Sequence, residues 1–113
     1  MTKTITRDLI LEKDTTFDES IIVEGNIYGK GGARFDLTVR GDITASHITA
    51  LNIIARDINA RDINTWNIIA GDINYYAVCF AYKHITCKSI KGRRENAKHF
   101  CLDGKITIKE ASG

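Results

Sequence analysis

Residues 39–75 read VRGDITASHITALNIIARDINARDINTWNIIAGDINY, and this stretch decides the fold. Isoleucine recurs at every fifth position, and two positions after each isoleucine stands a small residue. The isoleucines are Ile43, Ile48, Ile53, Ile58, Ile63, Ile68 and Ile73; the small residues are Ala45, Ala50, Ala55, Ala60, Thr65 and Ala70, until Tyr75 ends the run. Neither a helical period nor plain strand alternation produces this repeat. It is typical of a solenoid.

A second period, of fifteen residues, predicts how the chain coils. Asp42, Asp57 and Asp72 share this spacing, as do Asn52 and Asn67. In an extended segment residues i and i+2 face the same way, so the isoleucine and the small residue of each repeat both point inward. We therefore expect an all-β, right-handed parallel β-helix, triangular in section, with about 15 residues per coil in five-residue sides.

The flanking sequence favours a single β-helix domain over residues 1–113. Residues 1–20 are expected to be an N-terminal lead-in or cap, residues 21–90 the coils, and residues 91–113 a loop and a C-terminal capping strand. The segment Val23–Ile27 matches Val39–Ile43 sixteen residues later. Between them KGGARFD, with paired glycines, predicts a corner that absorbs one extra residue.

Composition narrows the class of protein. The chain has 113 residues, 43% of them hydrophobic and 27% charged, and a net charge of +2. A nucleic-acid-binding protein usually has a stronger basic bias, so the composition disfavours a nucleic-acid partner. The N-terminus has no long apolar run, which predicts neither a signal peptide nor a membrane span. Three cysteines without a secretion signal indicate reduced thiols and a cytoplasmic location.

The outward positions, taken fifteen residues apart, predict one apolar side. One side carries Thr44, Asn59 and Asn74, the next Thr49, Asn64 and Cys79, and the third Val39, Ile54 and Ile69, followed by His84. The corner beside the third side adds Leu51 and Trp66. Exposed apolar patches usually mark a contact, so we expect an interface at Val39, Leu51, Ile54, Trp66 and Ile69. The alternative is that residues 1–20 or 91–113 fold back over this side.

Two groups of residues suggest metal sites, and for both another interpretation is favoured. The aspartates at 42, 57 and 72 could hold a cation such as Ca²⁺. However, Arg40, Arg56 and Arg61 can neutralise them, and Asp before a core residue suits a corner. A zinc site could use Cys79, Cys87, Cys101, His84 and His99, but the spacing lacks a CxxC or HxxxH pair. Cys79 and Cys101 are instead expected to fill or edge the core. We predict no metal and no cofactor.

The segment from residue 88 to residue 99 is basic. It contains Lys88, Lys91, Arg93, Arg94 and Lys98, together with His99. Such a segment could meet phosphates, but a glutamate interrupts it and no aromatic residue interleaves it, which favours a solvated loop. The chain also has no nucleophile elbow and no P-loop, so no catalytic residues are assigned and we predict that it is not an enzyme.

Residues 21–45 resemble the bactofilins, which are polymer-forming bacterial cytoskeletal proteins. The resemblance lies in the V-x-G-N/D-I segments, here Val23–Ile27 and Val39–Ile43. It implies a right-handed triangular β-helix, end-to-end or lateral self-assembly without nucleotide, and no catalytic residues. The five-residue rhythm is also similar to that of pentapeptide-repeat proteins, written A-D/N-L-x-x, although those coils have four sides and Arg56 and Arg61 stand at the alanine position.

The function expected from the sequence is that of a non-catalytic, structural or self-assembling β-helical module. Its partner would be another copy or another protein, contacted through the apolar side. The alternative is a protein- or nucleic-acid-binding accessory domain that uses the basic 88–99 segment. An enzyme fragment or a carbohydrate-binding β-helix fits less well, because no acid/base pair of side chains can be assembled.

Overall fold

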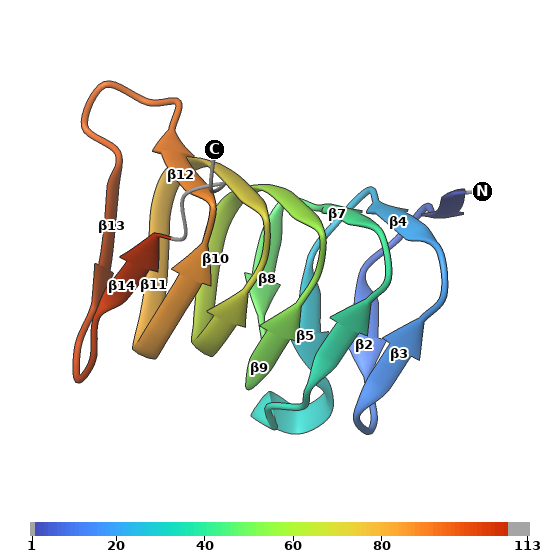
Figure 1. Cartoon of the computed structure of the whole chain (residues 1–113). Coiled ribbons are helices and arrows are strands. Elements are labelled where there is room, and N and C mark those ends of the chain that lie inside the picture. The colour runs from blue at the N-terminus through green and yellow to red at the C-terminus, as the bar shows by residue number, and fades with distance from the viewer. Residues whose placement is uncertain (1, 109–113) are drawn as a thin grey trace.

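The fold was obtained as a computed structural model that describes residues 2–108. It is a parallel β-solenoid of about six turns, as the repeat predicts (Figure 1). The described chain holds one short 3-10 turn, η1 (Lys30–Gly32), and no helix of the length and apolar character needed to cross a membrane. The strands are β1 (Thr2–Ile5), β2 (Leu9–Leu11), β3 (Thr15–Phe17), β4 (Ser20–Val23), β5 (Ile27–Gly29), β6 (Leu37–Val39), β7 (Asp42–Thr44), β8 (His47–Thr49), β9 (Asn52–Ile54), β10 (Asp57–Ile69), β11 (Asp72–Cys87), β12 (Ser89–Gly92), β13 (Lys98–Cys101) and β14 (Ile106–Ile108).

Each turn contributes to three columns of hydrogen-bonded strands. The first column runs β1, β4, β7, β10, β11, β12, and the second runs β2, β5, β8, β10, β11, β13. The third runs β3, β6, β9, β10, β11, β14. The long strands β10 and β11 pass through all three columns. Residues 2–17 therefore supply the first turn and residues 89–108 the last. The right-handed coiling and the triangular section stay predictions.

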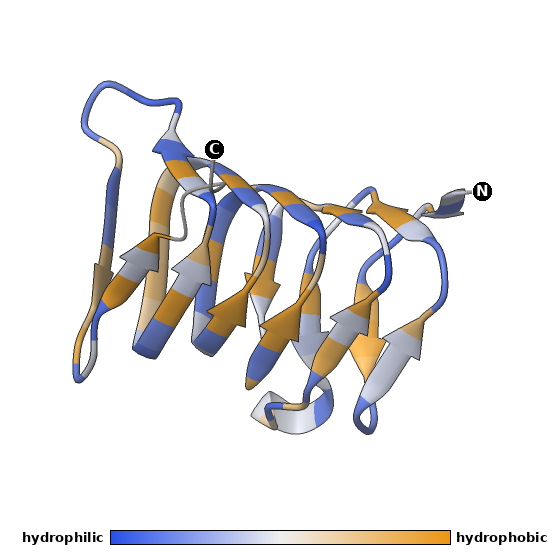
Figure 2. Cartoon of the chain, in the orientation of Figure 1, coloured by the Kyte–Doolittle hydropathy of each residue, from blue (hydrophilic) through white to orange (hydrophobic). Residues whose placement is uncertain are grey.

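The interior is built from stacked isoleucines. Ile43, Ile58 and Ile73 pair in the first column, and Ile53, Ile68 and Ile85 pair in the third, all of them fully buried. Figure 2 shows the resulting alternation of hydrophobic and hydrophilic residues along the strands. Burying one isoleucine contributes roughly 1.5–3 kcal/mol, so the interior column is the main source of stability. Tyr75 takes the place of a small residue and is also buried.

The fifteen-residue coil holds only in the middle of the stack. Asp42, Asp57 and Asp72 pair in register at this spacing. The spacing is longer at the two ends, where Ser20 pairs with Thr2, and Ser89 pairs with Asp72, seventeen residues before it. The average spacing is about 17 residues per turn. The extra residues lie at corners, where they lengthen a turn without disturbing the core.

The corner at η1 is larger than the sequence predicts. Ile21 pairs with Ile43, twenty-two residues later, whereas the prediction was a sixteen-residue repeat. Gly31 and Gly32 adopt positive φ angles of 65° and 83°, which glycine tolerates without steric cost. As a result the two V-x-G-N/D-I segments do not stack on each other. Val23 pairs with Ile5 in the first column, and Val39 pairs with Phe17 in the third.

Candidate interaction surfaces

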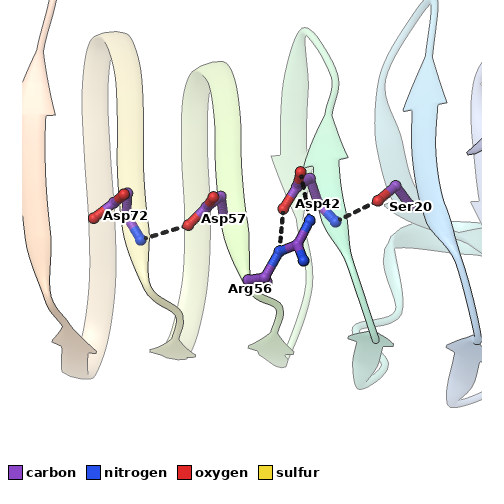
Figure 3. Close-up of polar contacts among 5 residues, drawn as sticks. All are labelled: Ser20, Asp42, Arg56, Asp57 and Asp72. Carbon is purple, nitrogen blue, oxygen red and sulfur yellow. Dashed lines mark hydrogen bonds and ion pairs between the residues drawn. The ribbon is translucent and has the colours of Figure 1, made fainter.

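The aspartates of the first column form hydrogen bonds and an ion pair with residues near the corners (Figure 3). Asp57 Oδ1 accepts the backbone N–H of Asp72 at 2.9 Å, and Asp72 Oδ1 accepts the hydroxyl of Ser89 at 2.8 Å. Asp42 pairs with Arg56, whose Nε lies 3.1 Å from Asp42 Oδ1. This pairing raises the pKa of Arg56, first through the hydrogen bond and then through the charge of Asp42. Asp57 thus binds a backbone N–H at the corner, as the corner interpretation predicts, while the carboxylates of Asp42 and Asp72 bond to side chains.

The other arginines proposed as counter-ions lie elsewhere. Arg40 pairs with Asp18 at 3.5 Å, and Arg61 lies over the ring of Tyr76. Within residues 2–108 no cluster of three or more His, Cys, Asp or Glu side chains has the geometry to hold a metal ion.

Several of the cysteines and histidines considered for zinc lie in the core or bond to a buried residue. Cys79 is buried in the core, and burial raises the pKa of its thiol to about 12. The expectation that Cys79 fills or edges the core is confirmed, whereas the fifteen-residue spacing, which put it at an outward position after Asn64, is wrong for this residue. It pairs with Ile63 because the corner after Tyr75 contains an extra residue, which shifts the register. His99 Nδ1 lies 2.6 Å from the hydroxyl of buried Tyr75.

The apolar side of the third column is exposed, but one of the residues predicted to lie on it is buried. Ile54 and Ile69 are 44% and 52% exposed and pair side by side. Val39 is only 2% exposed, so its assignment to this surface is wrong. Thr38 pairs with Ile54 instead, because the turn between them has sixteen residues. A second corner insertion makes Thr86, not His84, the partner of Ile69.

The corner beside this column adds aromatic surface. Trp66 is 37% exposed and its ring centroid lies 4.7 Å from that of Tyr82, which the sequence pattern did not identify. Leu51 is half-buried, and its carbonyl accepts the backbone N–H of Trp66 at 2.9 Å. We call Leu51, Ile54, Trp66 and Ile69 the apolar face.

A polar row runs along the same column as the apolar face. Asn52 Nδ2 donates to Asp36 Oδ1 at 2.8 Å, and Asn67 Nδ2 donates to Asn52 Oδ1 at 2.8 Å. Asn67 Oδ1 in turn accepts the backbone N–H of His84 at 3.2 Å. A groove of about 480 Å³ is lined by this polar row and by Thr38, Ile54, Ile69 and Thr86.

No described segment covers the apolar face. Residues 15–17 and 106–108 form β3 and β14, which pair at the two ends of the third column and do not lie across it. The alternative of a terminal segment folding back is therefore wrong for residues 2–20 and 91–108. Residue 1 and residues 109–113, which it also includes, lie outside the described residues.

The middle of the basic segment protrudes from one end of the stack, while its two flanks pair with β11. Residues 93–97 form the loop between β12 and β13, which Figure 1 shows rising beyond the other turns. Residues 93–96 are exposed, as the solvated-loop interpretation predicts, and Figure 2 shows this loop as mostly hydrophilic. Arg93 reaches back to the stack, where its Nη2 donates to the carbonyl of Ala60 at 3.3 Å.

Comparison of the chain with protein-family models, with curated proteins and with solved structures finds no significant match.

Proposed function

We propose that this chain is a non-catalytic, self-assembling structural module whose copies contact one another through the apolar face. The observation that carries the proposal is the exposure of Ile54 and Ile69, paired on a regular sheet that no described segment covers. Contiguous exposed apolar surface is costly in water and usually marks an interaction site. A sheet of this regularity presents the surface without a loop that must first be ordered, which lowers the entropic cost of association.

A second copy is the occupant that the face fits best. Symmetric dimers form when one patch is complementary to itself under a two-fold rotation. The polar row beside the apolar face has a carboxylate, Asp36, at one end and His84 at the other. A two-fold axis between Asn52 and Asn67 would set the Asp36 end of one copy against the His84 end of the second, with the isoleucines between them.

The resemblance of residues 21–45 to the polymer-forming bactofilins supports the same proposal. The three cysteines favour a cytoplasmic site of assembly.

The test replaces the two isoleucines of the apolar face by lysine. Ile54→Lys with Ile69→Lys places four charges in a two-copy interface, so we expect association to weaken at least about tenfold in sedimentation velocity over a concentration series. The matched control is Asn59→Lys with Asn74→Lys, which adds the same charge to the outward positions of the first column. This control should associate like the wild type.

Two results would count against the proposal. The first is a wild-type chain that sediments as a monomer at every concentration, because it would then not self-associate. Unchanged sedimentation of the isoleucine variant, together with a sharp loss of stability, would mean that the face packs within the chain.

A further inference from the structure

The last three turns carry cations and exposed aromatic rings on the corner between the first and second columns and on the adjoining second column. They are Arg61, Tyr76, Arg93, Arg94, Lys98 and Phe100, which we call the basic–aromatic surface. These residues come from β10, from β11, and from the loop and strand after β12. In the sequence no aromatic residue interleaves the basic segment, and only the fold brings Arg61 and Tyr76 close to Arg93.

Two arginines, Arg61 and Arg93, lie over the ring of Tyr76. Its ring is 40% exposed, with the Arg61 guanidinium 5.2 Å and the Arg93 guanidinium 6.0 Å from its centroid. The loop backbone is tied down as well, because Arg93 N–H donates to Tyr75 O at 2.8 Å and Arg94 N–H donates to Tyr76 O at 2.9 Å. The guanidinium groups thus start from a restricted arrangement, which lowers the entropic cost of binding a ligand.

Phe100 supplies a partly exposed aromatic ring on the second column, which follows the corner that holds these cations. It is 45% exposed and pairs with Phe80, the two ring centroids lying 5.1 Å apart. Lys98 stands two residues before Phe100 in β13, so both side chains lie on the outward side of that strand.

The charge of this end of the molecule favours an anionic ligand. Residues 88–108 contain six basic and two acidic residues, a net charge of +4, whereas the whole chain has +2. The remaining residues therefore carry a net charge of −2. None of the ion pairs found within residues 2–108 uses Arg61, Arg93, Arg94 or Lys98. Cations that are not neutralised by a neighbouring carboxylate attract polyanions strongly.

We infer that the basic–aromatic surface binds single-stranded nucleic acid. Its four cations contact the phosphates, and a base stacks on Phe100. A single strand offers both the backbone charge and an unstacked base, and stacking on an aromatic ring is tolerant of sequence. A duplex keeps its bases stacked on each other and would leave Phe100 unused. This inference does not rest on self-assembly, which uses the apolar face.

The test measures binding of the full chain to a fluorescein-labelled oligothymidylate of about 15 nucleotides by fluorescence anisotropy. With four phosphate contacts, log K should fall against log salt with a slope of about −3, or roughly 50-fold between about 50 and 200 mM salt. Arg93→Ala with Arg94→Ala should weaken binding and reduce the slope by about 1.4. Phe100→Ala should weaken binding at least about fivefold and leave the slope unchanged.

The control variant removes equal charge at the other end of the stack. Arg7→Ala with Lys13→Ala should bind the oligonucleotide like the wild type. The inference is overturned if this control loses as much affinity as Arg93→Ala with Arg94→Ala, or if Phe100→Ala has no effect and a duplex binds equally well. It is also overturned if the oligonucleotide does not bind at low salt. If the Arg93/Arg94 variant then also loses self-association, the surface contacts a second copy instead.

Discussion

Cys79 occupies an interior position at which the preceding turns carry isoleucine. Ile27, Ile48 and Ile63 stack in this column, and Cys79 continues it without exposure to solvent. Burial raises the pKa of the Cys79 thiol from its ordinary value of 9.0 to about 12, with smaller contributions from Cys87 and Cys101. The thiol therefore stays protonated and behaves as a small apolar side chain.

This burial predicts that the protein loses stability at alkaline pH. The folded state holds the Cys79 proton more tightly than the unfolded chain, whose thiol titrates near 9.0. The stabilisation is fully present below that pH and declines as the pH rises toward 12, by at most about 1.4 kcal/mol per pH unit. Denaturant unfolding in a reducing buffer from neutral pH upward measures this slope.

Cys79→Val is the matched variant, because it keeps an apolar side chain of similar volume and removes the ionisable group. Its unfolding free energy should fall less steeply above pH 9.0 than that of the wild type. A smaller slope will remain, since burial also raises the pKa of Tyr75, Cys87 and Cys101. Identical slopes would show that Cys79 is not buried as described.

At the scale of the strand, one hydrogen-bond pattern recurs at the corners. A side-chain oxygen just before an inward-facing residue accepts the backbone N–H of the corresponding residue one turn later. The acceptors include Asp8 toward Asn26, Ser20 toward Asp42, Asp57 toward Asp72 and Asn67 toward His84. This pattern satisfies backbone groups that the corner removes from the sheet ladder. It explains why Asp, Asn and Ser stand before the core residues.

A substitution in the polar row measures how much this hydrogen-bond pattern contributes to stability. Asn67→Ala removes the donor to Asn52 and the acceptor of the His84 N–H, at 2.8 Å and 3.2 Å. Since the site is half-buried, we expect the free energy of unfolding to fall by about 1–3 kcal/mol in a urea titration. Asn59→Ala, at an exposed outward position of the same strand, should change it by less than about 0.5 kcal/mol. Equal losses in both variants would assign the effect to strand propensity.

At the scale of the whole molecule, the two proposed surfaces lie on different parts of the solenoid. Ile54 and Ile69 are in the third column, while Arg61, Tyr76 and Arg93 follow the corner between the first and second columns. A six-turn stack is stabilised mainly by contacts between neighbouring turns, so a surface change on one column should be transmitted weakly to another.

The two activities should therefore respond to separate variants. Ile54→Lys with Ile69→Lys should weaken self-association and leave oligothymidylate affinity within about twofold of wild type, because the changed sites share no partner with the cations. Arg93→Ala with Arg94→Ala should show the reverse. Sedimentation and anisotropy on the same samples measure both. If each variant reduced both activities equally, nucleic-acid binding would depend on the assembled form.

Some parts of the fold can be predicted from local spacing alone. The pairing of Ile43 with Ile58 and of Asp57 with Asp72 follows directly from the fifteen-residue period. Val39 and Cys79 could not be placed in this way, because a single extra corner residue changes an outward position into an inward one. The interface prediction was thus correct about the exposure of Ile54 and Ile69 and wrong about the burial of Val39.

By itself, the sequence determined a parallel solenoid with an isoleucine interior. The reason is that the inward pair of each repeat is a local pattern, which the pleat of a strand translates into one buried side. Only the tertiary structure decided which outward residues meet, because their alignment depends on the summed lengths of all the corners between them. These summed corner lengths place Arg61 and Arg93 around Tyr76. They also place Thr38 beside Ile54.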